Sequence, residues 1–192
     1  MPSFDLRGIK TGRYINTDGA VTYGPAHKIG DAMQCTLELR FAEGRLYAES
    51  TLAEYIKLAV GGTIGIGVKY IPNDAQKLLF DMKAADKTVN SAEIKGLKYT
   101  TKDIANYVGV GFYAPDKFDG VTKYTCVFVA RTLLGPPSMT FQTKGESITF
   151  QTPTSAGEFL ADHSPEQNLL IVSVADTEDD AIAWVDSWFE TP

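Results

Sequence analysis

Residues 34–41, QCTLELRF, alternate apolar and polar side chains with a period of two. In an extended chain, successive side chains point to opposite sides, so the alternation separates an apolar face from a polar one. The apolar set is Cys35, Leu37, Leu39 and Phe41. This pattern predicts a strand with one face on a core and the other toward solvent.

Comparable stretches predict further strands at 21–29, 63–71, 106–114, 122–134 and 168–174, but only two helices, at 72–83 and 176–189. The second helix carries an apolar stripe, and its expected core anchors are Ile182, Trp184, Val185 and Trp188. Residues 84–105 show weak periodicity, which indicates an exposed, irregular loop or insertion. The predicted fold class is mainly β: a sandwich or curved antiparallel sheet with one or two flanking helices.

A hairpin is predicted in residues 139–151, where the tripeptide FQT occurs twice around Lys144-Gly145. Pairing the two copies about that loop separates an apolar face from an uncharged polar one, because directly opposite residues share a face. The side chains expected to pack on the core are Met139, Phe141, Ile148 and Phe150. Those expected to meet water or another protein are Thr140, Gln142, Ser147, Thr149 and Gln151.

Charge is distributed unevenly along the chain. All 18 Lys and Arg residues lie at or before Lys144, whereas 10 of the 24 acids follow it. The first 144 residues therefore carry a net +4 and the last 48 a net −10. This asymmetry is typical either of a solvated acidic surface or of a molecule that associates head to tail.

Residue types that carry out catalysis are scarce. His27 and His163 have no partner at ligand spacing, and GVGFYA at 109–114 resembles a dinucleotide fingerprint without the following helix that the motif requires. Cys35 and Cys126 stand far apart, and we expect two buried thiols in a reducing compartment. The expectation is a protein that is not an enzyme, with no metal and no cofactor. The N-terminus, MPSFDLRGIK, predicts no secretory signal, and no apolar run predicts a membrane span.

The order of four segments resembles the major tail proteins, or tail tube proteins, of long non-contractile-tailed bacteriophages (siphophages). These segments are GGTIGIGVKYIPNDAQKLLF, YVGVGFYAP, GVTKYTCVFVARTLLGPPSMTFQTKGESITFQTPTSAGEF and DTEDDAIAWV. The resemblance covers about residues 23–189 and is most specific from Gly120 to Phe159. GRLYAESTLAE at 44–54 is similar to the family's loop between two early strands, whereas 84–105 depart from the pattern.

The resemblance implies a single tail-tube domain over 1–192, with an N-terminal arm at 1–19. Six copies are expected to form a ring-shaped β-barrel, with the 139–151 hairpins joining neighbours, and the rings to stack into a hollow tube. DNA is expected only as passing cargo. Implied partners are further copies of the chain and tape-measure, tail-terminator and baseplate proteins, with no membrane. The implied location is the virion tail, after assembly in the bacterial host cytoplasm. The loop implied to contact the next ring contains Arg45, Tyr47, Glu49, Glu54 and Lys57.

With stacking in view, the charge split suggests that the acidic C-terminal third contacts Arg45, Lys57 or Lys69 of the next ring. Other functions remain open. A tail terminator or baseplate hub would share the fold. A monomeric β-sandwich carbohydrate-binding module could use Tyr99, Tyr107 or Tyr113 as an aromatic platform. A hydrolase is disfavoured by the shortage of His and Cys.

Overall fold

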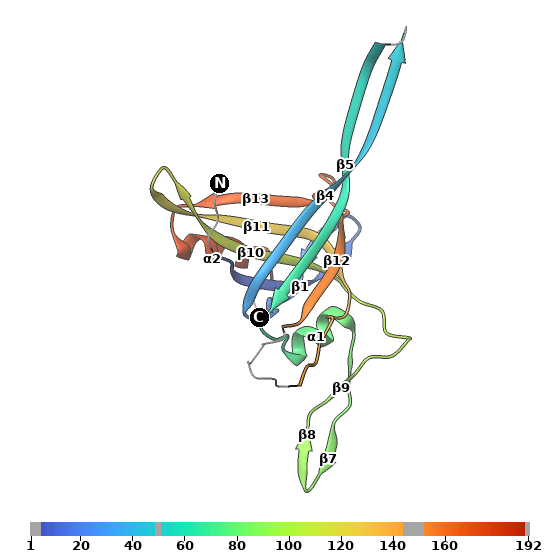
Figure 1. The fold of residues 1–192 in the computed structure, drawn as a ribbon, viewed down its shortest axis with the longest axis vertical. Helices are drawn as coiled ribbons and strands as arrows, with labels where there is room; N and C mark the ends of the chain where they lie inside the picture. The colour runs from blue at the N-terminus through green and yellow to red at the C-terminus, as the bar shows by residue number, and fades with distance from the viewer. Residues whose placement is uncertain (1–4, 49–50, 144–151, 191–192) are drawn as a thin grey trace.

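The computed structural model of the chain describes residues 5–48, 51–143 and 152–190 (Figure 1). Most of these residues belong to one sheet of nine strands, in the order β2-β1-β10-β11-β12-β5-β4, with β13 added to β11 and β3 to β1. Its strands are β1 (Arg7–Thr17), β2 (Ala20–Tyr23), β3 (His27–Lys28), β4 (Ala32–Ala48), β5 (Thr51–Val68), β10 (Tyr107–Phe118), β11 (Val121–Leu134), β12 (Thr154–Leu160) and β13 (Leu170–Ala175). The prediction of a mainly antiparallel β fold is confirmed.

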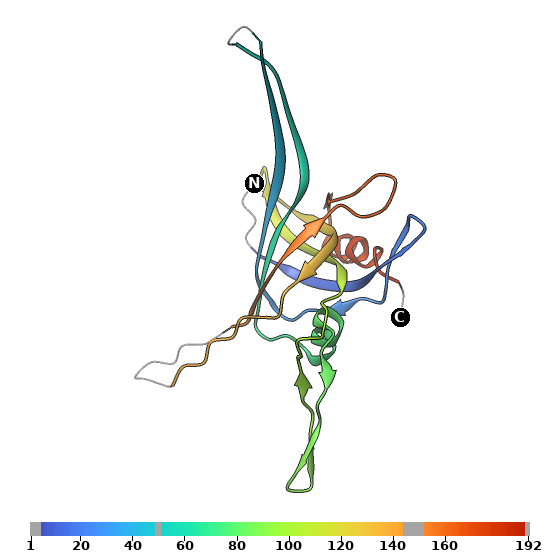
Figure 2. The same ribbon diagram turned by 90° about the vertical axis from the view of Figure 1, so that its right-hand side faces the viewer.

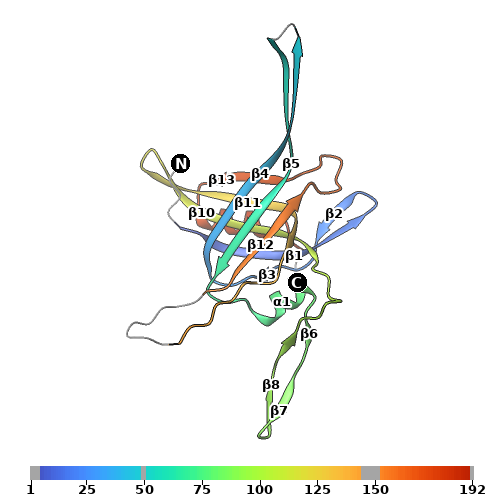
Figure 3. The same cartoon turned by 45° about the vertical axis from the view of Figure 1, so that its right-hand side comes forward.

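Strand β11 divides the sheet. One side of β11 pairs with β10, but its other side pairs with β13 along Tyr124–Val129 and with β12 along Arg131–Leu134. The strands beyond β12 therefore cross obliquely over β10 and β11 instead of lying flat beside them (Figure 3). The main core fills the space between the two parts of the sheet, with Ile64 and Ile66 of β5 on one side and Val108 and Val110 of β10 on the other.

The β10–β11 pair contributes to two cores because its side chains alternate between faces. Val110 lies opposite Val129, and both enter the main core. Gly111 lies opposite Phe128, on the face covered by helix α2 (Glu178–Asp186). Each of these strands is therefore buried on both sides, which explains why its predicted hydrophobic run is nearly continuous.

Helix α1 (Asn73–Phe80) closes one end of the main core. It follows Pro72, ends at Asp81 in the left-handed region (φ 53°), and buries Ala75, Leu79 and Phe80. It is shorter than the predicted 72–83, because the left-handed residue stops the helix before Met82.

Helix α2 begins at an N-cap, where the Thr177 hydroxyl accepts a hydrogen bond from the backbone N–H of Asp180. Of the predicted anchors, Val185 is buried, as expected, whereas Trp184 and Trp188 are only half-buried. The Trp188 ring stacks on Phe128 with the ring centroids 4.6 Å apart. The prediction for Ile182 is wrong: its side chain is 37% exposed, because the helix rests on the sheet through Ala181 and Val185.

The predicted N-terminal arm at 1–19 is also wrong over its described part. Residues 7–17 form β1, which pairs with β10, β2 and β3. Ile9 is fully buried, and the buried Thr11 hydroxyl donates to the carbonyl of Gly109 over 3.0 Å. These contacts tie β1 into the body of the fold.

Residues 83–98 are more regular than the predicted loop. They form two short antiparallel pairs: β6 (Lys83–Ala84) with β9 (Leu97–Lys98), and β7 (Lys87–Val89) with β8 (Ala92–Ile94). Asn90 and Ser91 both have positive φ at the turn, as a tight two-residue hairpin turn requires. This projection extends from the α1 end of the molecule (Figure 2).

Candidate assembly surface

The most prominent surface feature is a long β-hairpin formed by the outer parts of β4 and β5. Strand β12 pairs with β5 only along Gly62–Gly67. In the part of β5 that precedes Gly62, β4 and β5 are therefore paired only with each other among the described strands. We call residues 41–48 and 51–60 the arm. The arm extends well beyond the body of the fold, at the end opposite α1 (Figures 1 and 2). A two-stranded ribbon without further packing is only marginally stable in water.

A bulge marks the point at which the arm leaves the body. The β4–β5 register shifts between Arg40, which pairs with Gly61, and Phe41, which pairs with Ala59. Gly61 has φ +148°, and a Cβ there would stand 2.8 Å from the carbonyl oxygen of Phe159. Glycine is therefore required where the hairpin bends away from the core.

One face of the arm carries interlinked charged and aromatic side chains. The Lys57 ammonium lies 4.5 Å from the centre of the Phe41 ring and 3.2 Å from the Glu43 carboxylate. The Arg45 guanidinium lies 5.4 Å from the centre of the Tyr55 ring and 3.6 Å from Glu43. Hydrogen bonds from Tyr55 and then Lys57 lower the pKa of Glu43. These contacts hold the face in one arrangement while leaving it open to solvent.

The opposite face of the arm, which we call the aliphatic face, lacks such contacts. Pairing places Ala42 opposite Leu58, Gly44 opposite Ile56 and Leu46 opposite Glu54, all on this face. Its large apolar side chains are Leu46, Ile56, Leu58 and Val60, which are 58%, 55%, 62% and 52% exposed. A contiguous apolar strip on a projecting element is typical of a protein–protein contact.

The residues implied to contact the next ring are partly brought together here. Arg45, Tyr47, Glu54 and Lys57 all lie on the arm, and Glu49 falls outside the described residues. Over its described residues, the loop predicted to contact the next ring consists instead of the outer parts of two long strands, β4 and β5. The aliphatic face was not predicted from the sequence, although the alternation of apolar and polar residues within Ala42–Val60 is the signal that could have revealed it.

Within the subunit, the charges of Arg45 and Lys57 already have a local partner, and their predicted contact with the next ring stays a prediction. Both side chains pair with Glu43 of the same arm. Several acids of the C-terminal third are also paired within the subunit. These pairs are Arg7 with Glu178, Lys10 with Asp186, Arg40 with Glu158 and Lys123 with Asp176. The sequence asymmetry is thus partly neutralised by the fold itself, because strands distant in sequence lie side by side.

The predicted 139–151 hairpin falls largely outside the described residues, which include Met139–Thr143 and Thr152 onward. Ser138 forms an isolated β-bridge with Thr154. The predicted hairpin, with its loop at Lys144-Gly145, would instead place Gln151 opposite Ser138, a difference of three positions. The core assignment of Met139 and Phe141 is wrong within the subunit, because they are 64% and 86% exposed. Thr140 and Gln142 are also exposed, whereas Ile148, Phe150, Ser147, Thr149 and Gln151 lie outside the described residues.

The glycines of the dinucleotide-like motif, the two cysteines and His163 all take part in packing or in contacts that join elements of the fold. Gly109 and Gly111 lie inside strand β10, away from any turn into a helix. Cys126 is buried and Cys35 is half-buried, where desolvation raises its pKa to about 12. The two ring nitrogens of His163 have different partners: Nδ1 lies 2.9 Å from the Tyr14 hydroxyl, and Nε2 lies 3.2 Å from the Arg131 guanidinium. This contact joins the loop after β12 to β1 and β11.

No group of three or more potential metal ligands occurs within residues 5–48, 51–143 and 152–190. In the same described part of the chain, no helix is long and apolar enough to cross a membrane. No protein-family model matches this sequence, and no curated protein matches it.

Proposed function

We propose that the chain is a structural subunit that assembles with copies of itself, as the major tail tube protein of a siphophage. The observation that carries the proposal is the arm, with its exposed aliphatic face. Such a surface raises the free energy of the isolated subunit, and contact with a second copy would remove it from water. The sequence resemblance to tail tube proteins supports the identity of the assembly.

The open edges of the sheet favour a ring. Strand β4 ends the path of the large sheet, and β13 pairs with β11 alone among the described strands. Exposed edges are templates for pairing with another chain, and closing a ring removes them. We propose six subunits per ring, stacked into a hollow virion tube through which DNA passes. The net charge of −6 would disfavour adhesion of DNA phosphates to the wall.

A carbohydrate-binding module is less well supported. Tyr113 is 6% exposed and donates a hydrogen bond to Glu178 over 3.0 Å, while Tyr107 lies against the Arg131 guanidinium. Only Tyr99 of the three is substantially exposed. A monomeric module would also leave the arm without a role.

Negative-stain electron microscopy of the concentrated protein, with light scattering on the same sample, tests the proposal. We expect rings or hollow tubes of uniform diameter, whose length grows with protein concentration. A tail terminator or hub would give single closed rings that do not elongate. A monomer at every concentration would contradict the proposal.

A further inference from the structure

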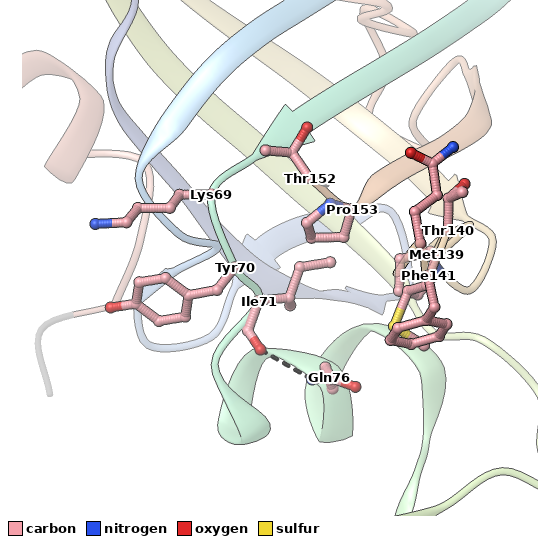
Figure 4. Close-up of a pocket in the computed structure, with 11 residues that line it drawn as sticks. Lys69, Tyr70, Ile71, Gln76, Met139, Thr140, Phe141, Thr152 and Pro153 are labelled. Carbon is pink, nitrogen blue, oxygen red and sulfur yellow. Dashed lines mark hydrogen bonds between the residues drawn. The ribbon is translucent and has the colours of Figure 1, made fainter. Parts of the chain in front are cut away.

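An apolar pocket lies at the end of the molecule opposite the arm, beside α1 (Figure 4). Its volume is about 430 Å³, within the range in which proteins accommodate ligands or partner side chains. Ile71 and Pro153 lie between two flanks: Lys69 and Tyr70 on one side, and Met139 with Phe141 on the other. The Gln76 side chain donates to the carbonyl of Ile71 over 2.8 Å, which fixes α1 against this wall.

The pocket leaves large apolar groups in water. Tyr70 is 52% exposed, and Met139 and Phe141 are more so. These side chains come from two segments that meet at the pocket: the connection between β5 and α1, and the stretch after β11. Such convergence of exposed apolar groups at one hollow is typical of a contact site.

We infer that this pocket receives the aliphatic face of the arm of a second copy, with Glu54 of that arm placed against Lys69. The inference rests on the proposed function and names the two surfaces that would meet between stacked subunits. The arm and α1, beside which the pocket lies, are on opposite sides of the body, so an arm does not reach its own pocket (Figure 1).

Charge complementarity supports this pairing. Glu54 lies on the aliphatic face, opposite Leu46, and has no ion pair among the described residues. Lys69 lines the pocket and likewise forms no ion pair in that part of the chain: its charge helps to lower the pKa of Asp31, but the direct partner of Asp31 is Lys28 at 2.6 Å. One unpaired acid on an apolar strip therefore matches one unpaired base beside an apolar hollow.

The contact joins two different patches of the same molecule. Such a heterologous contact leaves a free arm at one end and a free pocket at the other, so it repeats without closing on itself. A rod or tube built from this contact would therefore elongate by addition of further copies.

Zero-length carbodiimide cross-linking of an equimolar mixture of ¹⁴N- and ¹⁵N-labelled protein tests the contact. The reagent joins a carboxylate to an amine only when they touch, and the mixed label identifies links between copies. We expect an intermolecular Glu54–Lys69 link that disappears in Glu54→Gln. Tubes or rings without this link would overturn the docking contact and leave the proposed function intact. A link from Lys69 to a different carboxylate of a second copy would also overturn it.

A charge exchange tests the same pair in solution. Glu54→Lys and Lys69→Glu should each weaken self-association about fivefold, and the double variant should regain most of the loss. Glu93→Lys, on the β7–β8 hairpin, is the matched control and should change little. Additive losses in the double variant would contradict the pairing. Absence of any self-association in the unaltered protein would overturn the docking contact and the proposed function together.

Discussion

At the scale of single residues, Gly109 and Gly111 allow large side chains of neighbouring elements to pack closely against the backbone of β10. A Cβ at Gly109 would stand 2.6 Å from Cδ1 of Tyr23 and 2.7 Å from Cζ of Phe128, and one at Gly111 would stand 2.9 Å from Cγ1 of Val185. The two glycines therefore mark close packing, and the dinucleotide-like spacing is a by-product of strand alternation.

Gly109→Ala should lower the free energy of unfolding by about 1–3 kcal/mol, because the added methyl overpacks a buried site. Urea denaturation followed by tryptophan fluorescence measures the change. Gly44→Ala is the control, since nothing lies within 4 Å of a Cβ there. Equal effects of the two substitutions would contradict the packing argument.

Arg7 organises the charged groups at the start of β1. Its guanidinium donates to Glu178 over 2.8 Å and to Asp5 over 2.7 Å, and it lowers the pKa of both carboxyls. A lowered folded-state pKa adds stability above the unfolded value, near 4.5 for Glu178, which is lost as pH falls through the folded value.

Arg7→Gln should therefore destabilise the protein at pH 7 and have a smaller effect at pH 3, because the stability that comes from the lowered pKa values declines as the pH falls toward the folded-state values. Urea denaturation of the two proteins at both pH values measures this difference. Lys77→Gln, which removes an exposed pair with Asp74, serves as the control. A deficit that stays constant between pH 7 and pH 3 would show that the Arg7 side chain acts through packing alone.

At the scale of secondary structure, alternation in the sequence predicted most strands and both helices, because burial of one face leaves a periodic record. It did not predict where β4 and β5 continue into solvent. The arm alternates apolar and charged residues as a half-buried strand does, although both of its faces are exposed. Periodicity records that a face is apolar, but not which molecule covers it.

The pairing of charges within the arm could not be predicted from the sequence. Arg45 and Lys57 were expected to contact another copy, and in the subunit both side chains pair with Glu43. Pairing across a hairpin depends on register, and the bulges at Arg40 and Leu46 alter the register. A sequence does not reveal bulges of this kind, so the opposing residues of the arm could not be assigned.

The start of α2 offers a test at this scale. Thr177→Ala removes the hydroxyl that accepts from the Asp180 N–H, and it should cost about 0.5–2 kcal/mol of the free energy of unfolding. Thermal unfolding followed by circular dichroism measures the loss. Thr177→Ser keeps the acceptor and should stay close to the unaltered protein. If the serine variant lost as much as the alanine variant, the cap would not be the cause.

At the scale of the whole molecule, the fold has two extended ends around one body. The arm extends from one side of the body, and α1 and the 83–98 projection lie on the other (Figure 2). The pocket is beside α1. Part of the charge asymmetry of the sequence is neutralised inside the subunit, through pairs such as Lys10 with Asp186. Apolar surface, rather than net charge, is therefore the expected driving force for association.

Sedimentation velocity of the arm variant Leu46→Thr/Ile56→Thr/Leu58→Thr tests this central claim most directly. Threonine is β-branched, which strands favour, and it adds a polar group to the aliphatic face. The control, Val89→Thr/Ile94→Thr/Val121→Thr, alters three exposed apolar residues elsewhere. We predict large assemblies for the unaltered and control proteins and a folded monomer for the arm variant. Assembly of the arm variant at the same concentration as the unaltered protein would contradict the account.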